Sequence, residues 1–398
     1  MNASPDVARI ERRCRHFEAC GGCLWQDVPY EDQLERKRRS VQDLLHRALG
    51  SRHSPIVDPT LAPADPPWGF RTKVHFVLGA GERGRGLVMG HYRRGSQAIV
   101  PVEECPVHAE AGNRIAFAFR DALSDGRVPA VTGDLRGGVV RHVVVRVAQS
   151  SGQSLATLVV TRNDKLLRPA VRRVLAGDTA PAGLHLNVHP RPGSFLFGPD
   201  TTKLAGLSQV RERINDVDYL VSPTSFFQTN VLAAGRMVDL VLAELSGAAT
   251  VLDLYGGAGL FSLPLAKRGA RVTVVEESAG SVTDGDASRR VNRIAESRCR
   301  FVRARAEDVA SGFYRRVLSS PPDAVVMDPP RQGCSRAVMS WVAHTLRPPA
   351  IAYVSCNPEA LASDAGALVA AGYRVRRVQP IDMFPHTPHI EAVALFGR

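Results

Sequence analysis

The sequence predicts an α/β protein whose C-terminal part is a doubly wound, Rossmann-type parallel sheet. It is preceded by a β-rich α+β middle domain and an N-terminal segment built around a metal cluster. After residue 248, apolar strand-like runs alternate with helical stretches, whereas between residues 69 and 220 the strand-like runs are short and interrupted by Gly and Pro. The cysteines concentrate near the N-terminus. We therefore expect three regions, comprising residues 1–60, 61–220 and 221–398.

The composition of the whole chain is that of a folded, globular protein. It has 398 residues, more than one ordinary domain, of which 44% are hydrophobic and 23% charged. No apolar run approaches the roughly 18 residues of a membrane helix, and the first twenty residues contain no apolar core typical of a signal peptide. We therefore expect a cytoplasmic, monomeric protein that does not associate with membranes.

The net charge of +12 is unevenly distributed. Residues 51–215 contain 22 basic and 13 acidic side chains and so carry +9 of the total. A codon bias toward arginine, which provides 46 of the 51 basic residues, would raise the charge of every segment alike. The local excess therefore predicts a nucleic-acid-binding face in the middle domain.

The N-terminal region contains cysteines with the spacing of a metal centre. Cys14, Cys20 and Cys23 lie within ten residues, and two glycines between the last two allow a tight turn around a metal. With the remote Cys105, which precedes a proline, they resemble the ligands of an iron–sulfur cluster. We predict a 4Fe–4S cluster at these four cysteines. Zinc is the alternative, although four-cysteine zinc sites usually contain two short cysteine pairs.

A helix and a linker connect this region to the middle domain. Residues 27–49 show the apolar spacing of a helix, and the Pro-rich stretch PTLAPADPPWG follows it. One helical stretch, at residues 108–123, interrupts the strands of the middle domain. The strand-like runs there are KVHFVLG, QAIVPV, VVRHVVVRVA and SLATLVVT.

The C-terminal region predicts a parallel sheet that closes with an antiparallel pair. Helical stretches near residues 259–268, 284–296, 336–346 and 358–371 separate the strand-like runs TVLDLY, VTVVE, AVVMD and AIAYVSC. The last two runs, YRVRRVQPI and EAVALFG, are joined only by DMFPHTPHI. That link is too short for a right-handed crossover, so we expect these two strands to be antiparallel.

A glycine turn at the end of the first C-terminal strand predicts a cofactor site. The sequence VLDLYGGAGLF runs from a strand through glycines into a helix, which allows a ligand to approach the backbone. Glu276 lies 23 residues after Asp253, at the end of the next strand, where a carboxylate can bind ribose hydroxyls. This pattern suits dinucleotides and S-adenosylmethionine alike, but the full three-glycine dinucleotide fingerprint is absent.

Three reactive side chains follow later strands. Asp328, Cys356 and Glu391 should meet at the crevice where the carboxyl ends of parallel strands gather. A thiolate that adds to C6 of uracil makes C5 nucleophilic, and a base must then remove the C5 proton, which suits Cys356 and Glu391. Alternatively, Cys356 is a buried thiol and Glu391 caps a turn. We expect Cys334 and Cys299 to be packing residues.

With these residues in view, the chain resembles the RNA uracil-C5 methyltransferases, in particular the cluster-containing 23S ribosomal RNA enzymes. The resemblance covers nearly the whole length and is carried by many short matches in the order of the family. They are CRHFEACGGCLWQ, FRTKVHF, GHYRRGS, EECPV, SFFQTN, LDLYGGAGLF, DPPRQG, YVSCNP and PHTPHIEAVAL.

The resemblance implies a Rossmann-type S-adenosylmethionine-dependent methyltransferase domain and a role for each site residue. Cys356 is the implied nucleophile and Glu391 the base. Implied cofactor contacts are Gln228, Tyr255, Glu276 and Asp328, and the implied 4Fe–4S ligands are Cys14, Cys20, Cys23 and Cys105. Two positions depart from the family. Gly256 stands where members often have cysteine, and this change should be harmless. Leu260 stands where some members have a polar residue that contacts the cofactor, so that contact is not expected here.

The resemblance makes RNA the partner and 23S ribosomal RNA the favoured substrate. The transfer RNA uracil-54 enzymes are the alternative. The bacterial ones generally lack the cluster, which favours ribosomal RNA, but some archaeal ones keep it. We expect aromatic side chains to stack on unpaired bases and basic ones to neutralise phosphates. Alternatively, the aromatic residues belong to the core. The residues proposed for RNA are Arg71, Lys73, Phe76, Tyr92, Arg93, Arg94 and Arg141.

Other functions fit the sequence less well. RNA cytosine-C5 methyltransferases have a Pro-Cys pair at the Asp-Pro-Pro strand, whereas Arg331 follows the prolines here. An amino-group methyltransferase would need neither Cys356 nor Glu391. A non-catalytic iron–sulfur RNA-binding protein would not need to retain Gln228 and Asp328 as well.

Overall fold

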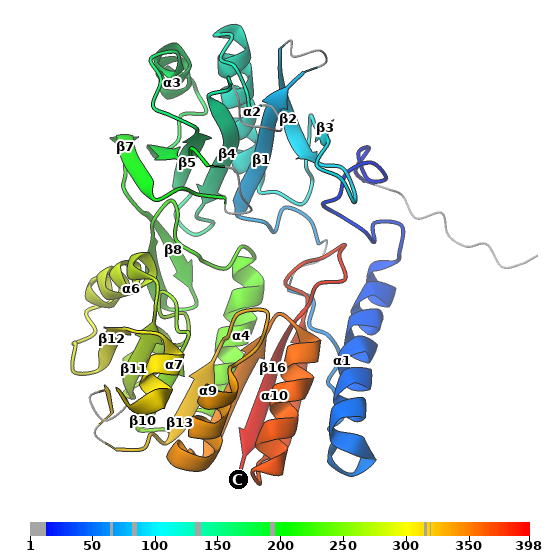
Figure 1. Ribbon diagram of the computed structural model, residues 1–398, viewed down its shortest axis with the longest axis vertical. Helices are drawn as coiled ribbons and strands as arrows, with labels where there is room; N and C mark the ends of the chain where they lie inside the picture. The colour runs from blue at the N-terminus through cyan, green and yellow to red at the C-terminus, as the bar shows by residue number, and fades with distance from the viewer. Residues whose placement is uncertain are drawn as a thin grey trace, which may run out of the picture.

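The computed structural model describes residues 13–63, 67–81, 86–131, 137–191, 196–313, 317–318 and 320–398. Two seven-stranded sheets dominate it. The first sheet and its helices form the upper part in Figure 1, and the second sheet and its helices form the lower part. Among the described residues, no helix is both long and apolar enough to cross a bilayer.

The second sheet is the predicted parallel sheet with an antiparallel closing pair. Strands β12, β11, β10, β13 and β14 are parallel neighbours in that order, and β16 then runs antiparallel between β14 and β15. The strands are β10 (Thr250–Leu254), β11 (Arg271–Glu276), β12 (Cys299–Arg303), β13 (Ala324–Met327), β14 (Ala350–Ser355), β15 (Arg374–Ile381) and β16 (Glu391–Gly397). The antiparallel prediction for the last two strands is confirmed.

Helices cover both faces of this sheet, so adjacent residues of a central strand enter different cores. Val251 packs in one core with α4 and α5, whereas Leu252 packs in the other with α9 and α10. Continuous apolar strands are expected where both faces are buried. The helices are α4 (Val231–Glu244), α5 (Ser262–Lys267), α6 (Ala279–Val291), α7 (Ala306–Asp308), α9 (Arg336–Ser340) and α10 (Pro358–Ala370), with π-helical turns at Val309–Phe313 and Trp341–Leu346.

The first sheet is mostly antiparallel, with the order β3-β2-β1-β4-β5-β6-β7 and one parallel pair, β5 and β6. Two helices, α2 (Glu110–Asp125) and α3 (Leu167–Ala176), pack with it. Its strands are β1 (Lys73–Ala80), β2 (Leu87–Tyr92), β3 (Ile99–Pro101), β4 (Val140–Val147), β5 (Ser154–Val160), β6 (Gly183–Val188) and β7 (Asp200–Gly206). The strand-rich character predicted for the middle region is therefore confirmed.

Three elements join the C-terminal sheet from elsewhere in the sequence. The hairpin of β8 (Val210–Ile214) and β9 (Val217–Val221), which we expected in the middle domain, packs in the same core as α4. Helix α1 (Tyr30–His53) packs beside α10 and β15 and is kinked at Gly50. The linker after α1 continues the sheet edge, because Val57 and Leu61 bridge to β15.

The local predictions were least accurate at polar edges. Strand β12 was not predicted, because Cys299–Arg303 is a short, half-exposed edge strand without a long apolar run. Helix α6 begins at Ala279, five residues before the predicted start, where Ser278 Oγ accepts a hydrogen bond from Ser281 N.

Candidate active site and metal centre

The glycine turn after β10 is held in a shape that exposes its backbone. Tyr255, Gly257 and Gly259 all have left-handed backbone conformations, with φ of 61°, 54° and 84°. A non-glycine residue in this region is strained, as is common at ligand sites. Gly257 N donates to Glu276 Oε2 at 3.0 Å, and Glu276 Oε1 accepts from Ser278 N at 2.7 Å. Glu276 therefore fixes the turn to the start of α6, at the place predicted for a cofactor contact.

The two departures from the family have clear structural settings. A Cβ at Gly256 would lie 2.4 Å from Val274 Cγ1, so this chain has no room for a side chain there without repacking. Leu260 is buried in the core, and its carbonyl accepts a hydrogen bond from the Tyr219 hydroxyl at 2.8 Å. The Leu260 side chain therefore packs with apolar groups and offers no polar contact.

Two aspartates at neighbouring strand ends lie in an acidic, buried environment. Burial raises the pKa of Asp253 to about 7, and the nearby carboxyl groups of Asp328 and Glu276 raise it further. Ser262 Oγ donates to Asp253 Oδ2 at 2.5 Å, while Asp253 Oδ1 has no partner among the described residues. Burial also raises the pKa of Asp328 to about 7. Both aspartates therefore retain a proton more readily than an exposed carboxyl group would.

Cys356, Asp328 and Glu391 share one electrostatic environment, as the strand topology predicted. Burial raises the pKa of the Cys356 thiol, the carboxyl groups of Glu391 and Asp328 raise it further, and the Arg331 guanidinium lowers it. The pKa of Glu391 is raised well above its usual value, first by burial and then by Asp328, whereas Arg331 again lowers it. The strand pairing agrees, because Ser355 lies opposite Ala392 and β13, which precedes Asp328, is the other neighbour of β14. Arg331 acts on the same groups as a fourth member.

The turns that present these residues are tied to each other. Asn357 caps α10 by accepting a hydrogen bond from Glu359 N at 3.1 Å, and its Nδ2 donates to the Arg331 carbonyl at 2.8 Å. Pro358 occupies the first turn of α10, where its missing N–H costs nothing. The Cys356 turn and the Asp-Pro-Pro-Arg turn are therefore held at a fixed spacing.

The loop that precedes Glu391, residues 382–390, is clamped by the N-terminal segment. His386 has a left-handed backbone, with φ of 65°, and its carbonyl accepts hydrogen bonds from Leu24 N and Trp25 N at 2.8 and 3.0 Å. The His386 ring stacks on Trp68 at 4.0 Å, and Gln33 Oε1 accepts from His386 N at 2.9 Å. The position of Glu391 therefore depends on contacts with residues more than 300 positions earlier.

Gln228 lies in the segment that leads into α4, next to the same loop. It is buried, and Asn230, two residues later, donates to the Met383 carbonyl at 3.2 Å. Ser225, in the same segment, borders the start of α6, since a Cβ at Gly280 would lie 3.5 Å from Ser225 Oγ. Gln228 therefore lies in a segment between the Glu276 turn and the loop before Glu391.

Tyr255 and Cys334 are directed toward another part of the domain. The Tyr255 hydroxyl donates to Glu307 Oε1 at 3.1 Å. Burial raises the pKa of Cys334 to about 12, with a further rise from Asp364. Cys334 also packs against the apolar core, and Cys299 is fully buried, as predicted for packing residues.

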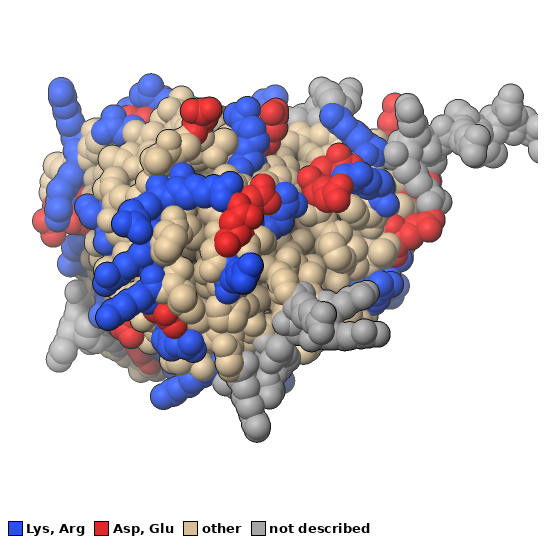
Figure 2. All heavy atoms as spheres, turned by 90° about the horizontal axis from the view of Figure 1, so that it is seen from above, with Lys and Arg blue, Asp and Glu red and all other residues tan. Residues whose placement is uncertain are grey.

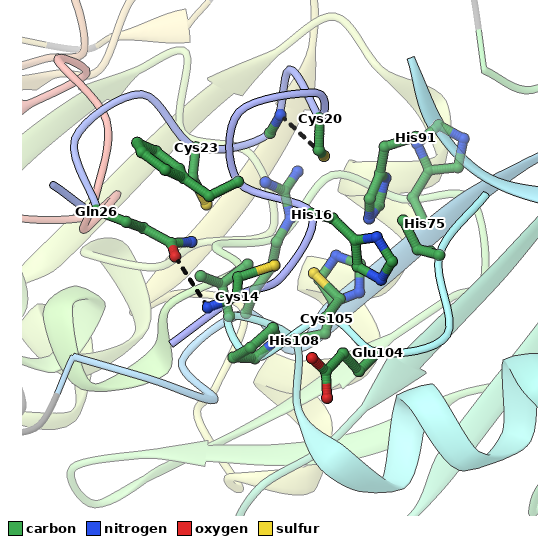
Figure 3. Close-up of a pocket in the computed structure, with 16 residues that line it drawn as sticks. Cys14, His16, Cys20, Cys23, Gln26, His75, His91, Glu104, Cys105 and His108 are labelled. Carbon is green, nitrogen blue, oxygen red and sulfur yellow. Dashed lines mark hydrogen bonds between the residues drawn. The ribbon is translucent and has the colours of Figure 1, made fainter. Parts of the chain in front are cut away.

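The four predicted metal-ligating cysteines line one cavity of about 110 Å³ (Figure 3). A single water needs roughly 10–15 Å³ of the same kind of volume, so the space is large enough for a polynuclear group. Burial raises the pKa of Cys23 to about 11 and that of Cys105 to about 12, and the neighbouring thiols contribute to both shifts. Buried thiols in such proximity ionise readily only beside a positively charged centre, and this set fits an iron–sulfur cluster.

The residues predicted to bind RNA are not all on the surface. Arg93, Arg94 and Tyr92 are exposed, next to the cysteine segment. Lys73 is half-buried, and burial lowers its pKa to about 7. Arg71 is half-buried too, and it lines the cysteine cavity.

Two of the RNA-binding predictions are wrong. Phe76 is fully buried and packs against His91 and Phe117, so it is a core residue. Arg141 is also buried, and its guanidinium donates to the His189 and Arg191 carbonyls at 2.7 and 2.9 Å. Because main-chain oxygens satisfy that guanidinium, it is not available to a phosphate.

The sequence reasoning missed two features of the site. Arg331 was used only to exclude a cytosine enzyme, although its place directly after Asp-Pro-Pro was a signal that it lies beside Asp328. The buried ion pair of Lys37 and Asp382, at 2.5 Å, joins residues 345 positions apart and left no local signal.

In sequence and in fold, this chain is similar to known RNA methyltransferases. A family model described as tRNA (uracil-5-)-methyltransferase matches residues 206–398. An uncharacterized RNA methyltransferase of Gloeobacter violaceus is 35% identical, over 100% of this chain and 84% of that protein. A second, from Halalkalibacterium halodurans, is 33% identical over 99% and 84%. Among solved structures, the tRNA (uracil-54, C5)-methyltransferase of Pyrococcus abyssi, in complex with S-adenosyl-L-homocysteine, has a TM-score of 0.77 and 27% identity over 94% of this chain and 85% of that one.

Proposed function

The chain belongs to the RNA uracil-C5 methyltransferase family and is an S-adenosylmethionine-dependent enzyme, and from this premise we propose that it methylates C5 of a uridine in 23S ribosomal RNA through a covalent bond between Cys356 and C6. The observation that carries the mechanism is the shared environment of Cys356, Glu391 and Asp328. A thiol whose pKa is affected by two carboxyl groups and one guanidinium supports nucleophilic attack coupled to proton transfer.

The chemistry assigns a separate task to each group. S-adenosylmethionine, when bound, would supply an electrophilic methyl group, and it would leave as S-adenosylhomocysteine once its sulfonium–methyl bond breaks. The Cys356 thiolate adds to C6, the C5–C6 double bond opens, and C5 becomes the nucleophile that accepts the methyl group. Glu391 then removes the proton from C5, and the double bond re-forms as the bond between Sγ and C6 breaks. The enzyme thiolate and the 5-methylated base result.

Arg331 and Asp328 influence whether Cys356 and Glu391 are protonated during these steps. Two neighbouring buried carboxyl groups do not both ionise easily, so Asp328 and Glu391 retain a proton at neutral pH more readily than exposed carboxyl groups do. Arg331 favours the ionised forms of both Cys356 and Glu391. We assign Arg331 the role of supporting the thiolate and the base.

The cofactor residues follow from their positions around the glycine turn. Glu276 stands at the end of β11, which supports a contact with the ribose hydroxyls, while Asp328 and the Tyr255 backbone lie at the ends of the neighbouring strands. Gln228 lies buried in the segment before α4, between the Glu276 turn and the loop before Glu391. We assign these four residues to S-adenosylmethionine binding.

We also assign a 4Fe–4S cluster to Cys14, Cys20, Cys23 and Cys105, with a structural role. Four cysteine ligands leave no open iron for a substrate. The ligands connect the N-terminal segment to the loop before α2, and the same segment holds the loop before Glu391 through His386. Anaerobic purification should give a brown protein with about four irons per chain. A colourless protein whose single zinc is lost when Cys14, Cys20 and Cys23 are replaced by serine would contradict the assignment.

A transfer RNA substrate is the second candidate, because the Pyrococcus abyssi neighbour is a tRNA (uracil-54, C5)-methyltransferase. The deciding experiment is mass spectrometry of ribosomal and transfer RNA from a deletion strain. Loss of one 5-methyluridine from 23S ribosomal RNA supports our proposal, and loss from the transfer RNA T-loop supports the second candidate. Reintroduced Cys356→Ala should not restore the lost nucleotide.

A further inference from the structure

The cysteine cavity contains a second set of potential metal ligands, which shares only Cys105 with the proposed cluster. One donor atom each from His91, Cys105 and His108 lies within 4.8 Å of the other two. Figure 3 shows His91 and His108 among the residues that surround the cysteines. His91 belongs to β2, whereas Cys105 and His108 belong to the loop between β3 and α2. The three donors therefore come from two neighbouring segments of the middle domain.

The hydrogen bonds of Asn113 fix the orientation of His108. Asn113 Nδ2 donates to the Cys105 carbonyl at 2.9 Å, so Asn113 Oδ1 is the atom that faces His108 Nδ1, at 3.2 Å. An amide oxygen only accepts, and His108 Nδ1 must therefore carry the proton. This leaves a lone pair on His108 Nε2. A histidine held in this way by an outer partner is characteristic of metal ligands.

His91 is held in place as well, and one of its ring nitrogens lacks a partner. His91 Nε2 is buried and makes no hydrogen bond within the described part of the chain. Its ring stacks on Phe76 at 4.9 Å and meets the edge of the His108 ring at 5.3 Å. A buried polar nitrogen without a partner is costly, and a metal ion would satisfy it.

We propose that His91, Cys105 and His108 form a binding site for a single zinc ion that competes with the cluster for Cys105. One thiolate and two imidazoles are ordinary zinc ligands, and the space of the cavity leaves the fourth position to water. Trigonal copper sites with the same donors usually add a distant methionine, and no methionine is among the described residues that line this cavity. Because both sites need Cys105, one chain holds either the cluster or this zinc ion.

The two metal states have different structural consequences. The cluster ties residues 14–23 to the middle domain, whereas zinc ties β2 to the loop before α2 and leaves Cys14, Cys20 and Cys23 without metal. In the zinc state, backbone bonds such as Gly21 N to the Tyr92 carbonyl, at 2.9 Å, remain to hold the N-terminal segment. We expect faster amide exchange in residues 14–25 of the zinc form than of the cluster form.

The test uses the full-length chain with Cys14, Cys20 and Cys23 replaced by serine, which removes the cluster ligands but keeps the proposed zinc ligands. The apoprotein should bind one equivalent of cobalt, with a thiolate-to-cobalt charge-transfer band and the visible bands of tetrahedral cobalt, and zinc should displace it. Adding His91→Gln or His108→Gln should abolish the bands. Adding Asn113→Ala should weaken binding by about 10–100-fold, since it removes only the outer partner.

His75→Gln is the matched control, because His75 lines the same cavity but its Nε2 lies 3.1 Å from His142 Nδ1. It should leave cobalt binding unchanged. Cobalt binding that survives the double change His91→Gln/His108→Gln, or no binding by the triple serine protein, overturns the proposal. His91→Gln in the chain with all its cysteines should still assemble about four irons. Iron content therefore tests the cluster, whereas cobalt binding tests the zinc site, so the failure of one assignment can be told from the failure of the other.

Discussion

At the scale of single residues, the site depends on how Glu391 and Cys356 keep and lose their protons. Burial and the Asp328 carboxyl group disfavour the charged forms of both groups, of which Glu391 is buried and Cys356 half-buried. Arg331 is the cation that opposes this effect. The proposed nucleophile and the proposed base therefore share one electrostatic environment, and a change at Asp328 or Arg331 should affect both.

The proposed order of steps predicts opposite behaviour for two variants. Glu391→Gln should lower turnover by about 10²–10⁴-fold, because the C5 proton is no longer removed, and a covalent complex with methylated RNA should accumulate. Cys356→Ala should form neither a complex nor product. Denaturing gels with radiolabelled RNA measure the complex. An adduct of 5-fluorouridine RNA at Cys334, located by peptide mapping, would contradict the assignment of the nucleophile.

The pH dependence of the reaction should reflect the raised pKa of Glu391. The base acts in its ionised form, so kcat/KM should rise as pH increases through a pKa above the usual glutamate range. Asp328→Asn removes a negative neighbour and should move this rise to lower pH. Arg331→Gln removes a positive neighbour and should move it to higher pH, each by about one unit, which corresponds to 1.4 kcal/mol. Shifts in the same direction for both variants would show that the profile reports another group.

At the scale of elements, α1 holds the loop that carries Glu391 into the site. Lys37 and Asp382 form an ion pair with both side chains fully buried, and Lys37 Nζ also donates to the Phe384 carbonyl at 3.1 Å. The Tyr30 hydroxyl donates to the second carboxylate oxygen of Asp382 at 2.8 Å. The loop thus depends on a helix that is far away in the sequence and that stands beside α10 in Figure 1.

Breaking this ion pair should destabilise the protein strongly. Lys37→Met keeps the volume but leaves Asp382 buried without a cation, at an expected cost of about 3–5 kcal/mol in the free energy of unfolding. Lys37→Met/Asp382→Asn should lose less, because no isolated charge remains and Asn still accepts from Tyr30. Thermal unfolding monitored by circular dichroism compares the two. Equal losses would mean that the charge of Asp382 is not the cause.

At the scale of the molecule, the positive charge lies where RNA is expected. Figure 2 looks down on the end of the protein that is uppermost in Figure 1, the end formed by the first sheet and its helices. Lys and Arg side chains gather mainly over the left half of this face, with Asp and Glu side chains between them. The exposed pair Arg93 and Arg94 follows β2, and Arg94 Nη2 donates to the Cys23 carbonyl at 3.3 Å. The proposed RNA face therefore adjoins the cysteine segment.

The salt dependence of RNA binding tests this face. Each phosphate contact that is lost should reduce the slope of log K against log salt concentration by about 0.7–0.9, so Arg93→Ala/Arg94→Ala should reduce it by about twice that amount. Arg290→Ala is the control, because Arg290 is exposed on α6 of the other part of the molecule. Fluorescence anisotropy across a salt series measures the slope. A slope equal to that of the unchanged protein would exclude these arginines as phosphate contacts.

The sequence by itself predicted a parallel C-terminal sheet with an antiparallel closing pair, the turn at residues 255–259 and the proximity of Asp328, Cys356 and Glu391. These features are predictable because strand and helix periodicity is local, and because parallel strands bring their carboxyl ends to one edge whatever the details of packing. The convergence of the four cysteines on one cavity was likewise predicted, from their number and spacing.

Only the tertiary structure decided which side chains are buried and which distant groups meet. Phe76 and Arg141 looked available for RNA, but helix packing and the His189 and Arg191 carbonyls enclose them. The Lys37–Asp382 pair depends on packing between segments hundreds of residues apart. No periodicity along the chain records such contacts, since they are selected by the free energy of burying and pairing groups after the elements have assembled.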